Sequence, residues 1–82
     1  MKQSIYQIAK SLDLENGTVR IWLSNYRFNK YKLIGKPLSY EVTKDMLNDL
    51  EEYLNKKIVT KKGTNKKIKD TIWNLKWLRA SI

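Results

Sequence analysis

Residues 4–24 read SIYQIAKSLDLENGTVRIWLS and contain two short helical patterns separated by a tight turn. The first pattern follows Ser4, a residue type that caps helices by accepting a hydrogen bond from the first turn. Apolar side chains then recur at helical spacing, which predicts one buried stripe. The members of that stripe are Ile5, Ile8, Ala9 and Leu12. The stripe stops at Asp13, a residue type that tolerates the left-handed backbone required by a tight turn between helices.

The second helical pattern predicts the partner of the first helix. Its inward positions are Val19, Trp22, Leu23 and Tyr26. Two such helices pack closely because Ala9 is small where the backbones approach and Leu14 fills the turn. The arrangement is typical of a helix-turn-helix, whose second helix keeps its outer residues free to meet the base edges of DNA. An ordinary helical hairpin without a nucleic-acid role is the alternative.

Strand-forming residues follow in two runs, residues 31–34 and residues 38–42, on either side of a Gly-Lys-Pro turn. Alternating strand formers around Gly and Pro predict a short hairpin. Thr43 then caps a third helix. The apolar face of that helix comprises Met46, Leu47, Leu50, Leu54 and Ile58.

Composition excludes several classes of function. The 82 residues suffice for one domain, and the 41% of hydrophobic residues suffice for it to fold. The absence of cysteine and histidine excludes disulfides, the usual zinc sites and imidazole catalysis. We therefore expect neither an enzyme nor a metal or cofactor site. Apolar runs are too short for a membrane span and no secretory signal is recognisable, so we expect a cytoplasmic protein without membrane contact.

The charge is the most informative part of the composition. Seventeen Lys and Arg residues against eight Asp and Glu residues give a formal net charge of +9. A surface this basic attracts polyanions, and nucleic acid is the usual polyanion in a cytoplasm. The alternative is a merely solubilising surface. Together with the helix-turn-helix pattern, the charge predicts binding to double-stranded DNA.

Four segments, SIYQIAKSL (4–12), GTVRIWL (17–23), YKLIGK (31–36) and YEVTKDML (40–47), follow one another along the chain. In this order they resemble the opening helix, recognition helix, wing and following strand and helix of the excisionase and MerR-like winged helix-turn-helix superfamily. The resemblance implies an excisionase-like recombination factor or a small transcription regulator of a phage or mobile element. Asp13 replaces the usual glycine. The effector-binding region and cysteines of metal-sensing MerR proteins are missing, so no small-molecule or metal sensing is implied.

The predicted fold is mainly α with a small β-hairpin, and the C-terminal part adds one helix. The expected organisation is a winged helix-turn-helix DNA-binding domain in 1–58, a basic linker in 59–67 and an amphipathic helix in 68–82. Thr64 or Asn65 caps this last helix. Its apolar arc is wide, which predicts packing on the domain or on a second subunit. Its apolar residues are Ile68, Ile72, Trp73, Leu75, Trp77 and Leu78.

The outer face of the second helix supplies the first group of predicted DNA contacts. They are Asn16, Gly17, Thr18, Arg20, Ile21 and Ser24. Arg20 is the best candidate for direct readout, because its planar fork can donate to guanine O6 and N7 together. Asn16 either reads adenine or caps the helix, and Ile21 either meets a thymine methyl group or belongs to the core. Gly17 permits close approach of the backbone to a phosphate, and Thr18 is expected to contact phosphate rather than a base.

Basic residues beyond the second helix supply the second group. Arg27, Lys30, Lys32 and Lys36 are predicted to clamp the DNA backbone or to enter the minor groove, with a solvated hairpin as the alternative. Lysines in and beyond the linker either track phosphates or are simply solvated. They are Lys61, Lys62, Lys66, Lys67 and Lys69.

Two other functions stay open at this point. A small phage-type inhibitor or adaptor would keep the fold and bind a host protein through its wing or last helix. RNA binding is less favoured, since it usually needs aromatic residues exposed on a sheet and only Tyr31 and Tyr40 qualify.

The last helix also predicts an oligomeric state. The tryptophans are interpreted as core residues, with Trp22 between the first two helices. In a homodimer through the C-terminal helix, Trp73, Trp77 and Leu78 would instead face the second subunit, since large aromatics are enriched at interface centres. A monomer whose thin core needs all three residues is the alternative.

Overall fold

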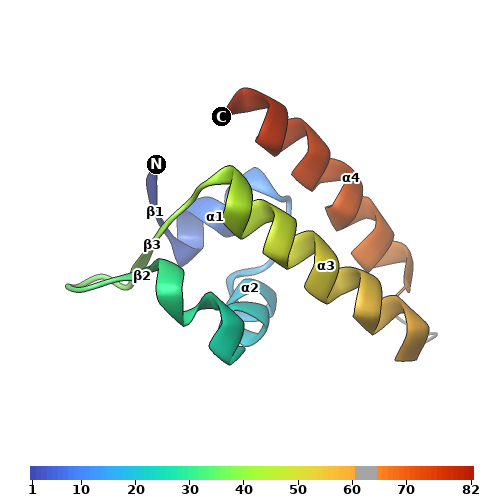
Figure 1. The fold of residues 1–82 in the computed structure, drawn as a ribbon, viewed down its shortest axis with the longest axis horizontal. Helices are drawn as coiled ribbons and strands as arrows, with labels where there is room; N and C mark the ends of the chain where they lie inside the picture. The colour runs from blue at the N-terminus through green and yellow to red at the C-terminus, as the bar shows by residue number, and fades with distance from the viewer. Residues whose placement is uncertain (61–64) are drawn as a thin grey trace.

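The computed structural model describes residues 1–60 and 65–82, with the side chains of 1–57 and 66–82. Its elements are β1 (Lys2–Ser4), α1 (Ile5–Ser11), α2 (Asn16–Leu23), the 3-10 helix η1 (Tyr26–Tyr31), β2 (Lys32–Leu33), β3 (Ser39–Glu41), α3 (Lys44–Thr60) and α4 (Asn65–Ser81) (Figure 1). The protein is thus mainly α with a small antiparallel sheet and a C-terminal helix. This confirms the predicted fold class.

The N-terminal helix, turn and helix form as predicted. Ser4 caps α1 in a capping box: its hydroxyl accepts from the Gln7 amide, and the Gln7 side chain accepts from the Ser4 amide. Asp13 has a φ of 56°, the left-handed conformation expected of the reversing residue. The amide of Leu14 donates to the carbonyl of Ala9 at 2.8 Å, which closes the turn. The α1 stripe and the inner side of α2 are buried.

The sheet has one strand more than predicted. β2 and β3 form the expected hairpin, with Leu33 opposite Ser39, and β1 pairs antiparallel with the other edge of β3. In that second pairing Ser4 lies opposite Ser39 and Lys2 opposite Glu41. The short N-terminal segment has no run of strand formers. A distant partner strand therefore determines its conformation, and local propensity does not.

The segment after α2 corrects one prediction. Tyr26, expected to face inward, is 82% exposed, and Phe28 is fully buried in its place. The reason is that α2 ends at Leu23, and extended backbone at Asn25 interrupts the helical period. The Asn25 side chain accepts from the Arg27 amide at 3.1 Å and so starts η1 in a new phase. Phe28 then packs edge-on against Tyr53 of α3, with ring centroids 5.8 Å apart.

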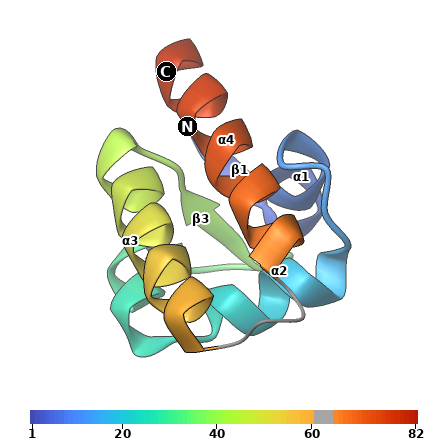
Figure 2. The same ribbon diagram turned by 90° about the vertical axis from the view of Figure 1, so that its right-hand side faces the viewer.

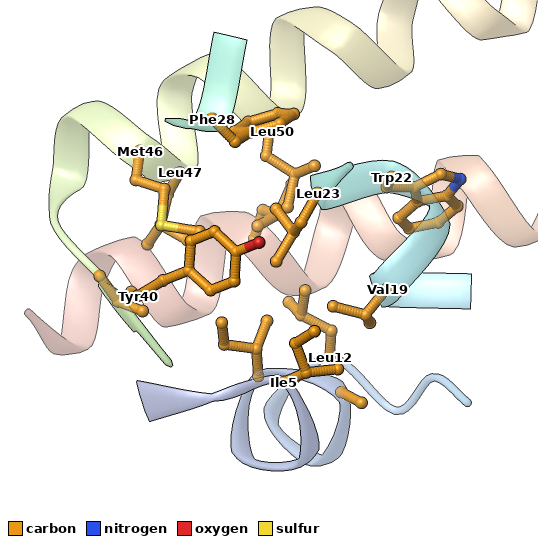
Figure 3. Packing of buried hydrophobic residues seen from close by; sticks show 14 of the residues in the cluster. Ile5, Leu12, Val19, Trp22, Leu23, Phe28, Tyr40, Met46, Leu47 and Leu50 are labelled. Carbon is orange, nitrogen blue, oxygen red and sulfur yellow. The ribbon is translucent and has the colours of Figure 1, made fainter. Parts of the chain in front are cut away.

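All helices and β3 contribute to one core (Figure 3). The predicted face of α3 is buried, and Thr43 accepts from the Met46 amide as the expected cap. Ile58, predicted for the same face, lies outside the residues whose side chains are described. Tyr40 of β3 and Trp22 of α2 are buried in the same cluster. A single core of this kind fixes α2 relative to the hairpin.

α4 packs on α3 and reaches the turn between α1 and α2 (Figure 2). Ile68, Thr71 and Leu75 are buried, and the Asn74 side chain donates to the Leu12 carbonyl at 3.2 Å. Arg79 lies 2.9 Å from Glu51 of α3. The C-terminal helix therefore belongs to the same folded unit.

Two predictions about the C-terminal part need correction. Trp73 and Trp77 are 60% and 65% exposed, so neither is a core residue, whereas Trp22 is. They lie on the side of α4 opposite Leu75, which takes the inward position. The predicted linker is also shorter, because α3 continues to Thr60 and α4 begins at Asn65. The remainder, 61–64, with Lys61, Lys62 and the candidate cap Thr64, lies outside the described residues.

Candidate nucleic-acid interface

The outer face of α2 is exposed along its whole length. Helical periodicity turns Val19, Trp22 and Leu23 into the core and leaves the opposite side in solvent. Thr18 lies at the boundary and is half-buried. The exposed predicted residues are Asn16, Gly17, Arg20, Ile21 and Ser24. For Ile21 the core alternative is wrong, because the side chain is 67% exposed.

The first turn of α2 has unpaired backbone donors. Glu15 is the N-cap and makes no side-chain cap, so the alternative of Asn16 as the cap is wrong. Asn16 occupies the first helical position instead. Within the described part of the chain, the amides of Asn16 and Gly17 find no acceptor, whereas those of Thr18 and Val19 donate to the Glu15 carbonyl. Such free amides at a helix N-terminus favour an anionic ligand.

Gly17 has no packing reason to be glycine. A Cβ built at this position would meet nothing within 4 Å, and the residue is helical with no positive φ. Glycine in a helix costs about 0.5–1 kcal/mol relative to alanine. The turn that carries the free amides therefore also has a backbone position without a side chain on the surface.

A hollow of about 430 Å³ brings α2 together with the hairpin loop and the start of α1. Its wall includes Asn16 and Arg20, both predicted contacts, and Tyr6, Pro37 and Leu38, which sequence analysis missed. Ser4 and Ile5 complete it. Tyr6 is 61% exposed and lies off the apolar stripe of α1, the one signal that could have marked it. Arg20 thus lines a concave surface that is built by three separate elements.

The hairpin loop, residues 34–38, projects from the body of the protein at the end away from α4 (Figure 1). Gly35 has a φ of 129°, a conformation that favours glycine, and so permits the turn. Ile34, the first residue of the loop, is fully exposed, and Lys32 and Lys36 are exposed as well. The hairpin thus exposes two of the predicted basic residues, Lys32 in β2 and Lys36 in the loop, together with an aliphatic side chain.

Arg27 and Lys30 are not brought to this surface, which corrects their predicted place. The Arg27 guanidinium donates to the Asp49 carbonyl at 3.4 Å and lies 3.9 Å from the Glu52 carboxylate. Lys30 lies 3.4 Å from the Asp49 carboxylate, to which the Tyr31 hydroxyl donates at 2.5 Å. The bond from Tyr31, followed by Lys30, holds the pKa of Asp49 below its usual value. These cations attach η1 to the acidic side of α3.

Of the predicted contacts that the structure describes, only Asn16 and Arg20 line the hollow. Ser24 follows the last residue of α2, and its hydroxyl donates to the Ile21 carbonyl within the helix at 2.5 Å. Lys66, Lys67 and Lys69 are exposed on α4, which contributes nothing to the wall of the hollow. The surface that the structure assembles thus comprises the N-terminal half of α2, the start of α1 and the hairpin loop.

The described residues include no group of three or more acidic side chains placed to hold a metal ion. None of the described helices combines the length and hydrophobicity needed to cross a bilayer. Comparisons with protein-family models, with curated proteins and with solved structures find no match to this chain.

Proposed function

We propose that the protein binds double-stranded DNA sequence-specifically, as a binding protein and not as an enzyme. The observation that carries the proposal is the shared hollow. Arg20 and Asn16 of α2 open onto the same concave surface as the hairpin loop, in a chain with a net charge of +9. A recognition helix in the major groove would contact base edges, and a basic loop would contact the flanking backbone. Specific binding requires both kinds of contact.

We assign the individual roles from the exposure and placement of these residues. Arg20 donates to guanine, and Asn16 contacts a neighbouring base. The free amides of Asn16 and Gly17 donate to a phosphate, and Lys32 and Lys36 bind the backbone on the hairpin side. The resemblance to excisionase and MerR-like proteins extends the proposal to a recombination factor or small transcription regulator of a phage or mobile element, acting in the cytoplasm.

The salt dependence of binding tests the electrostatic part of this proposal. Each phosphate contacted lowers log affinity by about 0.9 per unit of log salt concentration, and ~4–6 contacts are expected from α2 and the loop. Raising salt from 50 to 200 mM should therefore weaken binding on the order of 10²–10³-fold. Electrophoretic shifts with genomic fragments, with and without heparin, measure both affinity and preference. An affinity that does not change with salt, or complexes that heparin removes from every fragment alike, would contradict the proposal.

Gly17→Ala tests whether a phosphate approaches the first turn of α2. The added methyl group meets open space, so the free energy of unfolding should rise by about 0.5–1 kcal/mol. DNA affinity should fall, because the same methyl group stands between the free amides and the phosphate. Urea denaturation and DNA titration measure the two effects on one sample.

Asn55→Ala, at an exposed position of α3, is the matched control and should leave DNA affinity unchanged. A stabilised Gly17→Ala variant with unaltered affinity would show that DNA does not come close to this turn.

A further inference from the structure

The outward side of α4 exposes two tryptophans on a helix that is held in place. Trp73 and Trp77 are 60% and 65% exposed, although Leu75 between them is fully buried. The bond from Asn74 to Leu12 and the ion pair of Arg79 with Glu51 fix the helix against its neighbours. The exposure of the indoles is therefore a property of the docked helix. Two large apolar side chains kept in water at adjacent turns mark a surface for a partner.

The charges around the indoles are mostly positive. At 100° per residue, three exposed lysines and one exposed aspartate lie on the same side of α4 as the tryptophans. We call this surface the Trp face: Lys66, Lys69, Asp70, Trp73, Lys76 and Trp77. Lys69 and Lys76 form one edge of it, and Asp70 lies on the other. A ligand that complements this face must combine negative charge with apolar side chains.

We propose that the Trp face binds an acidic segment of another protein that carries aliphatic side chains. Its aliphatic groups would cover the two indoles, and its carboxylates would pair with Lys69 and Lys76. The hairpin loop projects from the end of the molecule away from the start of α4 (Figure 1), and no described residue of α4 lines the hollow. Binding at the Trp face would thus use none of the proposed DNA contacts.

Two other occupants fit the observations less well. In a homodimer with antiparallel α4 helices, the edge formed by Lys69 and Lys76 would meet the same edge of the second copy, and each chain already carries a net charge of +9. Single-stranded nucleic acid stacks successive bases on the open faces of aromatic side chains. The two indoles, however, meet edge to face, with an angle of 72° between their planes and 6.3 Å between their centroids.

The test measures the fluorescence anisotropy of labelled amphipathic peptides titrated with the full chain. One peptide carries leucine at helical spacing and glutamate elsewhere. In the second serine replaces leucine, and in the third lysine replaces glutamate. The first should bind at least roughly tenfold more tightly than either of the others. The double variant Trp73→Ala/Trp77→Ala should lose on the order of tenfold or more of that affinity.

Controls separate the Trp face from general attraction to a basic protein. Tyr26→Ala removes an even more exposed aromatic residue elsewhere and should leave peptide affinity unchanged. Lys69→Ala/Lys76→Ala should reduce both the affinity and its salt dependence. The tryptophan double variant should keep the wild-type circular dichroism melt and DNA affinity, because both side chains are exposed.

Three results would overturn the proposal. Equal binding of the glutamate–leucine and glutamate–serine peptides would show that charge alone attracts them. A wild-type dimer in sedimentation equilibrium that Trp77→Lys dissociates would identify a second copy as the occupant. Displacement of the peptide by oligo(dT), with weaker oligo(dT) binding in the tryptophan double variant, would identify a single-stranded nucleic acid.

Discussion

Phe28→Ala is expected to lower the free energy of unfolding by about 3–5 kcal/mol, the range for removing a buried aromatic side chain. The Phe28 ring is fully buried, and its edge-to-face contact with Tyr53 joins η1 to α3. A small domain has on the order of 5 kcal/mol of stability in total. The variant should therefore be largely unfolded near 37 °C. Urea denaturation followed by circular dichroism measures the loss.

Tyr26→Ala is the matched control for this experiment. Tyr26 belongs to the same 3-10 helix and is aromatic, but it is 82% exposed. Its removal should change stability by no more than about 0.5 kcal/mol, as for other surface substitutions. A loss below about 1 kcal/mol for Phe28→Ala would mean that η1 is not packed on α3, since buried aromatic residues do not cost so little.

Arg20→Ala is expected to weaken binding to the best DNA site by about 1–3 kcal/mol, or roughly 5- to 150-fold. It should also flatten the preference at one base pair, because the bidentate contact to guanine carries that preference. Titration of a set of duplexes that differ at single positions measures both effects. The side chain is exposed on α2, so folding should be unaffected.

Lys36→Ala distinguishes contact with the DNA backbone from recognition of a base. This exposed lysine of the hairpin loop should weaken binding to all duplexes alike and make the salt slope shallower by about one unit. If Arg20→Ala behaves in the same way as Lys36→Ala, then Arg20 contacts phosphate, and the proposed contact with guanine is wrong. If it changes neither affinity nor preference, α2 is not the recognition helix.

Local chemistry made the N-terminal half predictable. Ser4 caps a helix through its own hydroxyl, and Asp13 takes a left-handed conformation through its own short side chain, so both can be recognised from neighbouring residues. β1 and η1 depend on distant partners. β1 is a strand because β3 lies beside it, and Phe28 turns inward because α3 offers Tyr53. Neither partner is visible in the residues that surround the element in sequence.

The same distinction explains the candidate site. Asn16, Gly17 and Arg20 were predictable because α2 has one buried side and one free side. Tyr6, Pro37 and Leu38 were not, since the hollow exists only where three elements meet. Arg27 and Lys30 carry the charge expected of DNA contacts, but the acidic side of α3 lies within their reach. Helical periodicity placed Trp73 and Trp77 together without revealing which side of α4 the core would take.

The bond from Asn74 to Leu12 joins α4 to the turn before α2, so the hollow and the Trp face belong to one cooperative unit. A ligand that binds only the folded chain at either surface therefore adds to the stability of both, by RT ln(1 + [L]/Kd). Each ligand then raises the fraction of folded molecules, which are the molecules that the other ligand binds. This linkage is reciprocal and requires no conformational change. It vanishes when nearly every molecule is folded and grows as the folded fraction falls. In a variant as destabilised as Phe28→Ala, a ligand at one end of the molecule would thus restore binding at the other.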